Sequence, residues 1–323
     1  MIFQSKLLLL LILLFPTLKF TSLHDSGVED GNRRFFIFSS DPLIHFLSNS
    51  SHWFVDGTFK ITPGISFQLV AVHARYNDTH QTIPCAYLLL PNKTEAVYTA
   101  ALEALREMVD NAAPETVMVD FEKALHNAFA DVFPEAHVSA CFFHFCQSLR
   151  RHLSELGLTV LIDNDVEMAS MFAMFRSLPF VPLEHVVTSF NALKNQILES
   201  YGEVNNVAAF VTYVENTYIG ELLRNNRRRP PLFSHELWNV FDRTVAGSPR
   251  TNNSVEGCHN RLRSFMNFAV ESDIIQLDAG VAPRPLSTVW RLLERRRVEL
   301  TANFDHRDPL SYLRNMARTL AAL

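Results

Sequence analysis

Between residues 33 and 158, short apolar runs alternate with helical patterns, and this alternation constrains the fold more than any other feature of the sequence. Runs rich in aromatic and β-branched residues, bounded by turn residues, predict strands at 33–40, 52–59, 64–74 and 83–90. The later segments predict a helix at 93–112, a strand at 115–122, a helix at 123–133, a strand at 136–145 and a helix at 146–158. This order is typical of the α/β class.

The second half of the chain changes character. Residues 160 to 225 are helical in period and poor in strand signals, which predicts an all-helical insertion with helices at 166–179, 182–202 and 205–223. The basic, proline-containing stretch 224–238 predicts a loop, followed by helices at 251–268 and within 287–323. We therefore expect a leader at 1–33, a first part of the α/β core at 34–159, a helical insertion at 160–250, and a final core helix with a helical tail at 251–323.

Composition bounds the class of protein and its partners. The chain has 323 residues, of which 48% are hydrophobic, so it can bury a large core. A net charge of -5 gives no general attraction to DNA or anionic membranes, and four sparsely placed cysteines favour a reducing compartment. The apolar run from Leu7 to Phe15 has the length of a signal-peptide core and is too short to span a bilayer. A signal peptide and a spurious start both remain open.

Two aspartates follow apolar, strand-like runs. Asp56 and Asp120 each occupy a place where an isolated buried carboxylate would carry a large desolvation cost. Two strands that deliver carboxylates to one end of a sheet form a site for Mg²⁺, and Glu256 is the candidate third acid, on one helical face with His259. The alternative is that each aspartate is a turn residue or a helix cap.

Cys141 and His144 form a second candidate site. They are three residues apart, near the junction of a predicted strand and helix. At this spacing the pair could bind a soft metal, the histidine could contact a phosphate, or both side chains could simply pack in the core. A closed zinc site is not expected, because the sequence has no second Cys/His pair at finger spacing.

Three arginine groups are candidates for contact with a phosphate backbone. The candidate DNA-binding residues are Arg227, Arg228, Arg229, Arg261 and Arg263. The group Arg291 and Arg295 to Arg297 is a weaker candidate, since Glu294 and Glu299 can neutralise part of its charge. The alternative for each group is a solvated surface.

Five segments in order resemble one known family. The segments "DGTFK", "FQLVAVH", "MVDFEKAL", "ACFFHFCQSLRRHLSELGL" and "RTNNSVEGCHNRL" resemble the catalytic core of Mutator-like transposases, the MULE transposase domain, over roughly residues 35 to 268. The resemblance implies a ribonuclease-H-like fold, a mixed sheet with flanking helices, and a helical insertion before the last acidic residue. In such a sheet the first strand lies beside the fourth, so Asp56 would meet Asp120.

The same resemblance implies function. Asp56, Asp120 and Glu256 become a DDE triad that holds two divalent cations, Mg²⁺ or Mn²⁺, for DNA cleavage and strand transfer, and Cys141 and His144 become the family's Cys-x-x-His pair. DNA at transposon ends is the implied partner, the nucleus is the implied location, a homodimer remains open, and no membrane partner is expected.

The chain also departs from its relatives. They commonly carry a zinc-binding DNA-reading domain ahead of the core, and no such Cys/His set is found in this sequence. We therefore expect a truncated copy that needs a separate DNA-recognition domain or chain. An enzyme is favoured because all three acids are present, and the alternative is a catalytically idle or domesticated remnant that binds DNA or protein.

Overall fold

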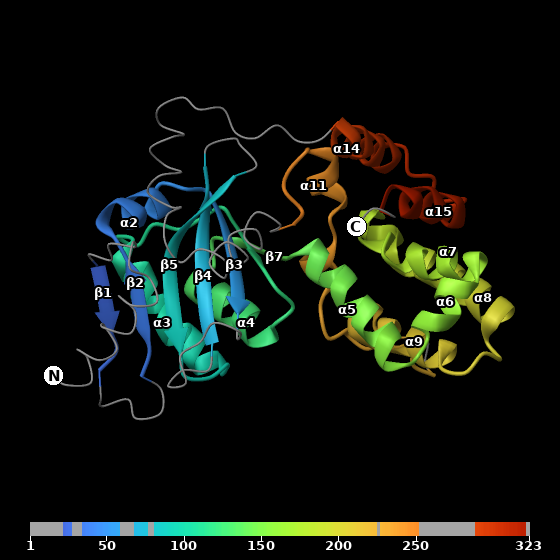
Figure 1. The fold of residues 1–323 in the computed structure, drawn as a ribbon, viewed down its shortest axis with the longest axis horizontal. Coiled ribbons are helices and arrows are strands. Elements are labelled where there is room, and N and C mark those ends of the chain that lie inside the picture. Colours follow the sequence, from blue (N-terminus) through green and yellow to red (C-terminus); the bar gives the residue numbers. More distant parts are fainter. Residues whose placement is uncertain are drawn as a thin grey trace. The chain divides into compact units, whose positions relative to one another are not determined.

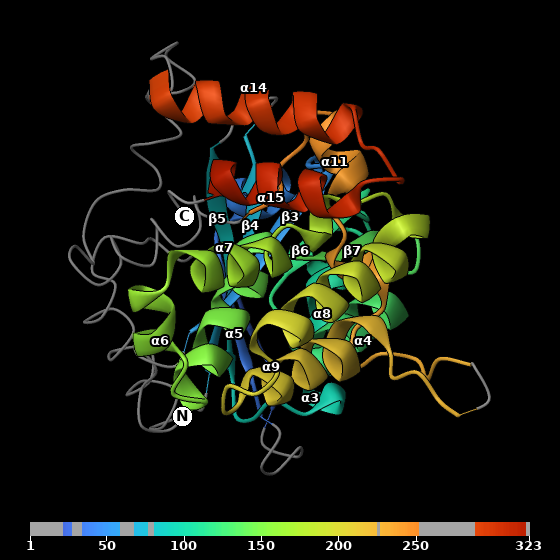
Figure 2. The same cartoon turned by 90° about the vertical axis from the view of Figure 1, so that its right-hand side faces the viewer.

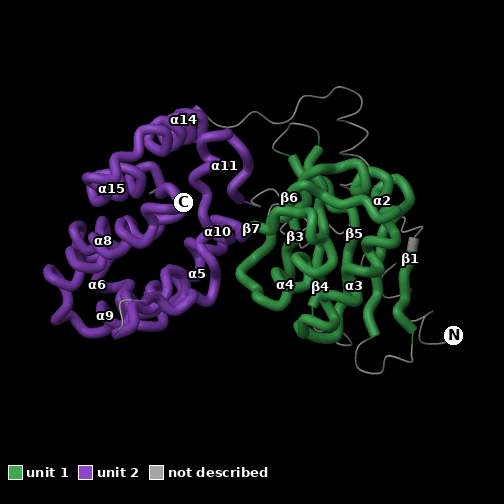
Figure 3. The backbone as a smooth tube through the Cα atoms, turned by 180° about the vertical axis from the view of Figure 1, so that it is seen from behind, with its two compact units in different colours: residues 1–139, 252–284 green, residues 140–251, 285–323 purple. Residues whose placement is uncertain are grey.

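The computed structural model describes residues 22–27, 34–58, 68–76, 81–224, 227–251 and 288–320. The chain divides into two compact units, shown in different colours in Figure 3. Unit 1 comprises residues 1–139 and 252–284, and unit 2 comprises residues 140–251 and 285–323. In the described ranges, no helix combines the length and the apolar character needed to cross a bilayer.

A mixed seven-stranded sheet dominates unit 1, with the strand order β1-β2-β5-β4-β3-β6-β7 (Figure 1). The elements are β1 (Ser22–Asp25), β2 (Phe36–Ser39), α2 (Asp41–Ser48), β3 (His52–Thr58), β4 (Gln68–Arg75), β5 (Thr82–Leu90), α3 (Glu95–Met108), β6 (Thr116–Val119), α4 (Lys123–Val132) and β7 (His137–Ala140). The pairs β1·β2, β2·β5, β5·β4 and β4·β3 are antiparallel, whereas β3·β6 is parallel. The α/β class is therefore confirmed.

Two elements differ from the sequence expectations. β1 lies inside the range taken as a leader, and its pairing with β2 makes residues 22–25 part of the sheet. The helix α5 begins at Phe142, not at residue 146, so the predicted strand 136–145 was too long. The reason is that Phe142, Phe145 and Leu149 form the buried stripe of a helix.

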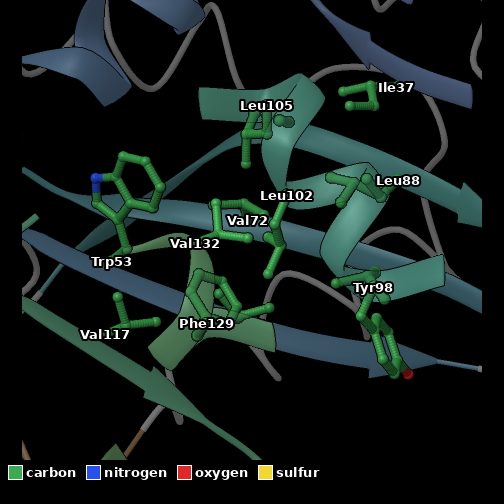
Figure 4. Close-up of a cluster of buried hydrophobic side chains, with 14 of the residues drawn as sticks. Ile37, Trp53, Val72, Leu88, Tyr98, Leu102, Leu105, Val117, Phe129 and Val132 are labelled. Atoms are coloured by element: carbon green, nitrogen blue, oxygen red, sulfur yellow. The ribbon is translucent and has the colours of Figure 1, made fainter. Parts of the chain in front are cut away.

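One face of the sheet carries the core of unit 1. Trp53 and Val55 of β3 and Val117 and Val119 of β6 project into a cluster that the helices α3 and α4 cover, part of which Figure 4 shows. The predicted helical stripe of α3 is confirmed, since its Val97, Ala101 and Leu105 side chains are buried in this cluster. Because successive side chains of a strand point to opposite faces, the residues between these positions project from the other face.

The described part of unit 2 consists of helices (Figure 2). They are α5 (Phe142–Glu155), α6 (Thr159–Asn164), α7 (Val166–Phe175), α8 (Val186–Tyr201), α9 (Val207–Val214), α10 (His235–Trp238), α11 (Phe241–Val245), α14 (Thr288–Ala302) and α15 (Pro309–Leu320), with short helical turns at Leu178–Phe180, Leu183–His185 and Glu215–Ile219. The aromatic rings of Phe145, Tyr218 and Trp238 pack on one another in its core. The helical character expected for residues 160 to 225 is confirmed where the chain is described.

Candidate metal site at the ends of two parallel strands

The first two predicted acids lie at matching positions on neighbouring parallel strands. β3 and β6 pair from His52↔Thr116 to Phe54↔Met118, a constant offset of 64 positions. The same offset places Asp56 opposite Asp120, the residue that directly follows β6. Parallel strands lie about 4.8 Å apart, so this offset makes the two aspartates neighbours at the carboxyl ends of both strands.

Side-chain alternation places Asp56 on the face opposite the core. His52 lies four residues before Asp56 on the same face of β3, and its Nδ1 atom lies 2.8 Å from Oγ1 of Thr116. Matching side chains of β3 and β6 therefore meet on this face. Asp56 itself is only 6% exposed, so its carboxylate lies in a desolvated setting.

Near neutral pH, the carboxyl group of Asp120 is present in both its charged and its neutral form. Burial, followed by the negative charges of Glu122 and Asp56, raises the pKa of Asp120 to about 7, against the opposing effect of Lys93. Its Oδ1 atom is buried and has no hydrogen-bond partner among the residues that the structure describes. A buried acceptor left unpaired costs about 1–3 kcal/mol. A divalent cation would satisfy this oxygen and favour the ionised carboxylate, so the two acids fit a metal such as Mg²⁺.

Local contacts fix the backbone around both acids. At Gly57, a Cβ atom would lie 2.2 Å from Nε2 of Gln68, so a side chain at the position after Asp56 would force the Gln68 amide to move. On the other strand, Nε2 of His126 in α4 is hydrogen-bonded to the backbone carbonyl of Asp120. Burial lowers the pKa of His126, which favours a neutral ring that donates this bond.

A polar network near Asp120 was missed by the sequence analysis. Glu122, two residues beyond Asp120, is hydrogen-bonded to Tyr98 and forms an ion pair with Lys93. The signal for Glu122 was its place in the run "DFE", where a second acid follows the first after one residue. No pattern marks Tyr98 or Lys93, because they lie at the start of a different helix or just before it.

The third predicted acid lies outside the described residues, together with His259, Arg261 and Arg263. Within the described ranges, no three Asp, Glu, His or Cys side chains form a group able to hold a metal ion. Asp56 and Asp120 thus supply two carboxylates, and the assignment of Glu256 as their partner remains a prediction.

Cys141 and His144 lie at the start of α5 in unit 2. Cys141 is the buried residue that precedes the helix, and His144 is half-buried in the first turn. Burial raises the pKa of the free thiol of Cys146 to about 12, so that side chain stays protonated. A role for the Cys-x-x-His pair remains a prediction.

The arginines of the loop after the π-helical turn differ in their surroundings. Arg228 is half-buried in unit 2, where its guanidinium contacts Glu215 at 3.1 Å and Asn191 at 2.8 Å. Arg229 is exposed and pairs with Glu221 at 3.2 Å. The predicted phosphate contacts of Arg227, Arg228 and Arg229 remain predictions, and the position of Arg228 gives it a structural role that the sequence analysis did not foresee.

Comparison with known proteins agrees with this geometry. Residues 52–148 match the family model of the MULE transposase domain, so this segment of the chain is similar to that family. Asp56, Asp120, Cys141 and His144 all lie inside the matched segment, whereas Glu256 lies beyond it. No curated protein and no solved structure matches the chain.

Proposed function

We propose that the chain carries the catalytic core of a DDE-type transposase, which cleaves DNA and transfers the cut strand with the help of Mg²⁺ or Mn²⁺. The observation that supports this most is the parallel pairing of β3 with β6 at a constant offset, which, when continued, brings Asp56 beside Asp120, and the charge of Asp56 contributes to the raised pKa of Asp120. The buried Oδ1 atom of Asp120, which has no hydrogen-bond partner within the described ranges, is an acceptor of the kind that a hard cation binds.

The strand order supports a ribonuclease-H-like sheet. β5, β4 and β3 form an antiparallel run, and β6 adds to β3 in parallel. This is the arrangement in which the first and fourth strands of such a core lie side by side. The order therefore agrees with the fold implied by the family resemblance.

The three acids of the proposed site act together as cation ligands. Asp56 and Asp120 bind cations through their carboxylate oxygens, and Glu256 supplies the third carboxylate. A pair of divalent cations held by these carboxylates would supply activation of water or a 3′ hydroxyl and stabilisation of the leaving oxygen of the phosphodiester. Asp120 must be ionised to bind a cation, and its pKa of about 7 makes this step sensitive to pH near neutrality.

DNA at transposon ends is the proposed substrate, and the nucleus is the proposed location. With a net charge of -5, the chain lacks a general attraction to DNA. We therefore propose that a separate DNA-recognition domain or chain directs it to its ends, and that a homodimer is one assembly able to bring two ends together.

The proposal is tested by nicking of supercoiled plasmid DNA by the full chain with Mg²⁺ or Mn²⁺. Wild-type protein is expected to nick, and Asp56→Asn and Asp120→Asn are expected to lose nicking while keeping their melting temperature or gaining stability. Equal nicking by wild type and both variants would sink the assignment of the site. A folded wild-type protein that neither nicks DNA nor binds Mn²⁺ would favour the idle, DNA- or protein-binding remnant.

A further inference from the structure

A chain of buried polar side chains connects the two strand ends that carry the aspartates. It begins at Gln68, the first residue of β4, whose amide packs against the Cα atom of Gly57, next to Asp56. Oε1 of Gln68 lies 2.6 Å from the hydroxyl of Tyr98 in α3, whose single proton is shared between Gln68 and Glu122. Both Gln68 and Tyr98 are 1% exposed, so these contacts are shielded from water.

The same hydroxyl reaches the loop that follows Asp120. The hydroxyl oxygen of Tyr98 lies 2.9 Å from Oε1 of Glu122, and Nζ of Lys93 lies 3.1 Å from Oε2 of Glu122. Burial, and then the negative charge of Glu122, raises the pKa of Tyr98 well above its ordinary value, so the hydroxyl keeps its proton and remains a donor. Figure 4 shows the Tyr98 side chain extending from α3 beside the core.

Glu122 has a different task from the two aspartates. Its Oε1 atom is held by Tyr98 and its Oε2 atom by Lys93, so both carboxylate oxygens are already engaged. The cation Lys93 also offsets a negative charge that would otherwise add to those of Asp56 and Asp120. An acid held in this way serves to fix the loop and does not serve as a metal ligand.

We propose that Glu122, held by Tyr98 and Lys93, is a positioning residue that sets the spacing of Asp56 and Asp120 for cation binding. Because Tyr98 also contacts Gln68, and Gln68 packs against Gly57, the same contacts fix the end of β3 that carries Asp56. Outer contacts that orient metal ligands typically change metal affinity by about 10- to 100-fold when they are removed. The inference rests on the proposed function, because it assigns the two aspartates to a cation.

The test compares Mn²⁺ affinity, measured by electron paramagnetic resonance titration of the full chain, across variants that keep the charge of the site. Tyr98→Phe removes one hydroxyl and no charge, and Glu122→Asp keeps the charge but shortens the reach to Tyr98. Both are expected to weaken Mn²⁺ binding by about 10- to 100-fold. The double variant is expected to be no weaker than the more affected single variant, since the two residues act as one unit.

Two controls separate positioning from general loss of stability. Tyr312→Phe, in unit 2, removes another buried tyrosine hydroxyl that donates to the carbonyl of Phe180, and it is expected to bind Mn²⁺ like the wild type. Asp120→Asn is expected to abolish binding. Melting temperatures of all variants show whether each protein is folded.

The outcomes distinguish this inference from the proposed function. If Asp120→Asn abolishes Mn²⁺ binding while Tyr98→Phe and Glu122→Asp bind as the wild type does, the positioning role is overturned and the cation site stands. If Tyr312→Phe weakens binding as much as Tyr98→Phe, the effect is general and the inference is again overturned. A folded wild-type protein that binds no Mn²⁺ overturns the cation site and the positioning role together.

Discussion

Asp120→Asn is expected to stabilise the metal-free protein at alkaline pH. The pKa of Asp120 is about 7 in the folded state because of burial and of the charges of Glu122 and Asp56, whereas an unfolded aspartate has a pKa of about 3.9. Between these values the folded state holds a proton that the unfolded state has released. Stability therefore falls as the pH rises from about 4 to 7, and the full loss is present above pH 7.

The loss of unfolding free energy that Asp120 causes follows from its pKa values in the folded and unfolded states. Each unit of pKa difference corresponds to about 1.4 kcal/mol, so a folded-state value of about 7 sets a ceiling of about 4 kcal/mol at pH 8. Between pH 5 and the folded-state pKa of about 7, the unfolding free energy falls by about 1.4 kcal/mol for each pH unit, and above that pKa it no longer changes. The loss of stability that Asp120 causes from pH 5 to pH 8 is therefore at most about 3 kcal/mol. An asparagine has no charge to bury, so the variant lacks this contribution.

Urea unfolding in the presence of a chelator measures the unfolding free energies of the wild type and of Asp120→Asn at pH 5 and at pH 8. The difference in unfolding free energy between wild type and Asp120→Asn is expected to grow from pH 5 to pH 8 by about 1–3 kcal/mol in favour of the variant. Saturating Mn²⁺ is expected to reverse the order at pH 8, because only the wild type binds the cation. A difference that stays constant with pH would refute the account of Asp120 as a buried, charge-repelled acid.

Three further substitutions test packing around the site and in unit 2. Gly57→Ala should cost about 1–3 kcal/mol because its Cβ atom would overlap the amide of Gln68; an equal loss in a Gln68→Ala background would contradict this cause. Glu215→Ala should cost about 2–4 kcal/mol because it removes the buried carboxylate that two partly buried cations share, whereas the control Glu221→Ala, at an exposed pair, should cost under about 1 kcal/mol. Trp53→Ala should lower the unfolding free energy by about 3–5 kcal/mol, as measured by urea unfolding; a loss below about 1 kcal/mol would show that the core tolerates the cavity.

The pairing of Asp56 with Asp120 could be predicted because it depends on strand pattern and strand order. Apolar runs mark both strands, and the family resemblance supplies their adjacency, which the observed offset of 64 positions matches. The polar network around Glu122 could not be predicted in this way. Tyr98 and Lys93 contact Glu122 only through the packing of α3 beside α4, and helical periodicity does not specify which side chains meet across two helices.

Charge patterns were less informative than apolar patterns. The run of arginines at 227–229 looks uniform in sequence, yet Arg228 is directed inward by Glu215, whose partner Lys194 lies on another helix. In the later group, Arg297 is buried against Glu294 and Arg296 pairs with Glu299, as the nearby acids suggested. Sequence spacing predicts pairing within a helix because residues three or four apart share a face, but it does not predict partners from distant elements.

The most direct test of the proposed site is the anomalous diffraction of crystals soaked in Mn²⁺. The account predicts a manganese peak within coordination distance of a carboxylate oxygen from Asp56 and one from Asp120, and no peak there in Asp120→Asn crystals. Manganese bound elsewhere in the wild type, with both aspartates left uncoordinated, would contradict the central claim that these two strand ends form a cation site.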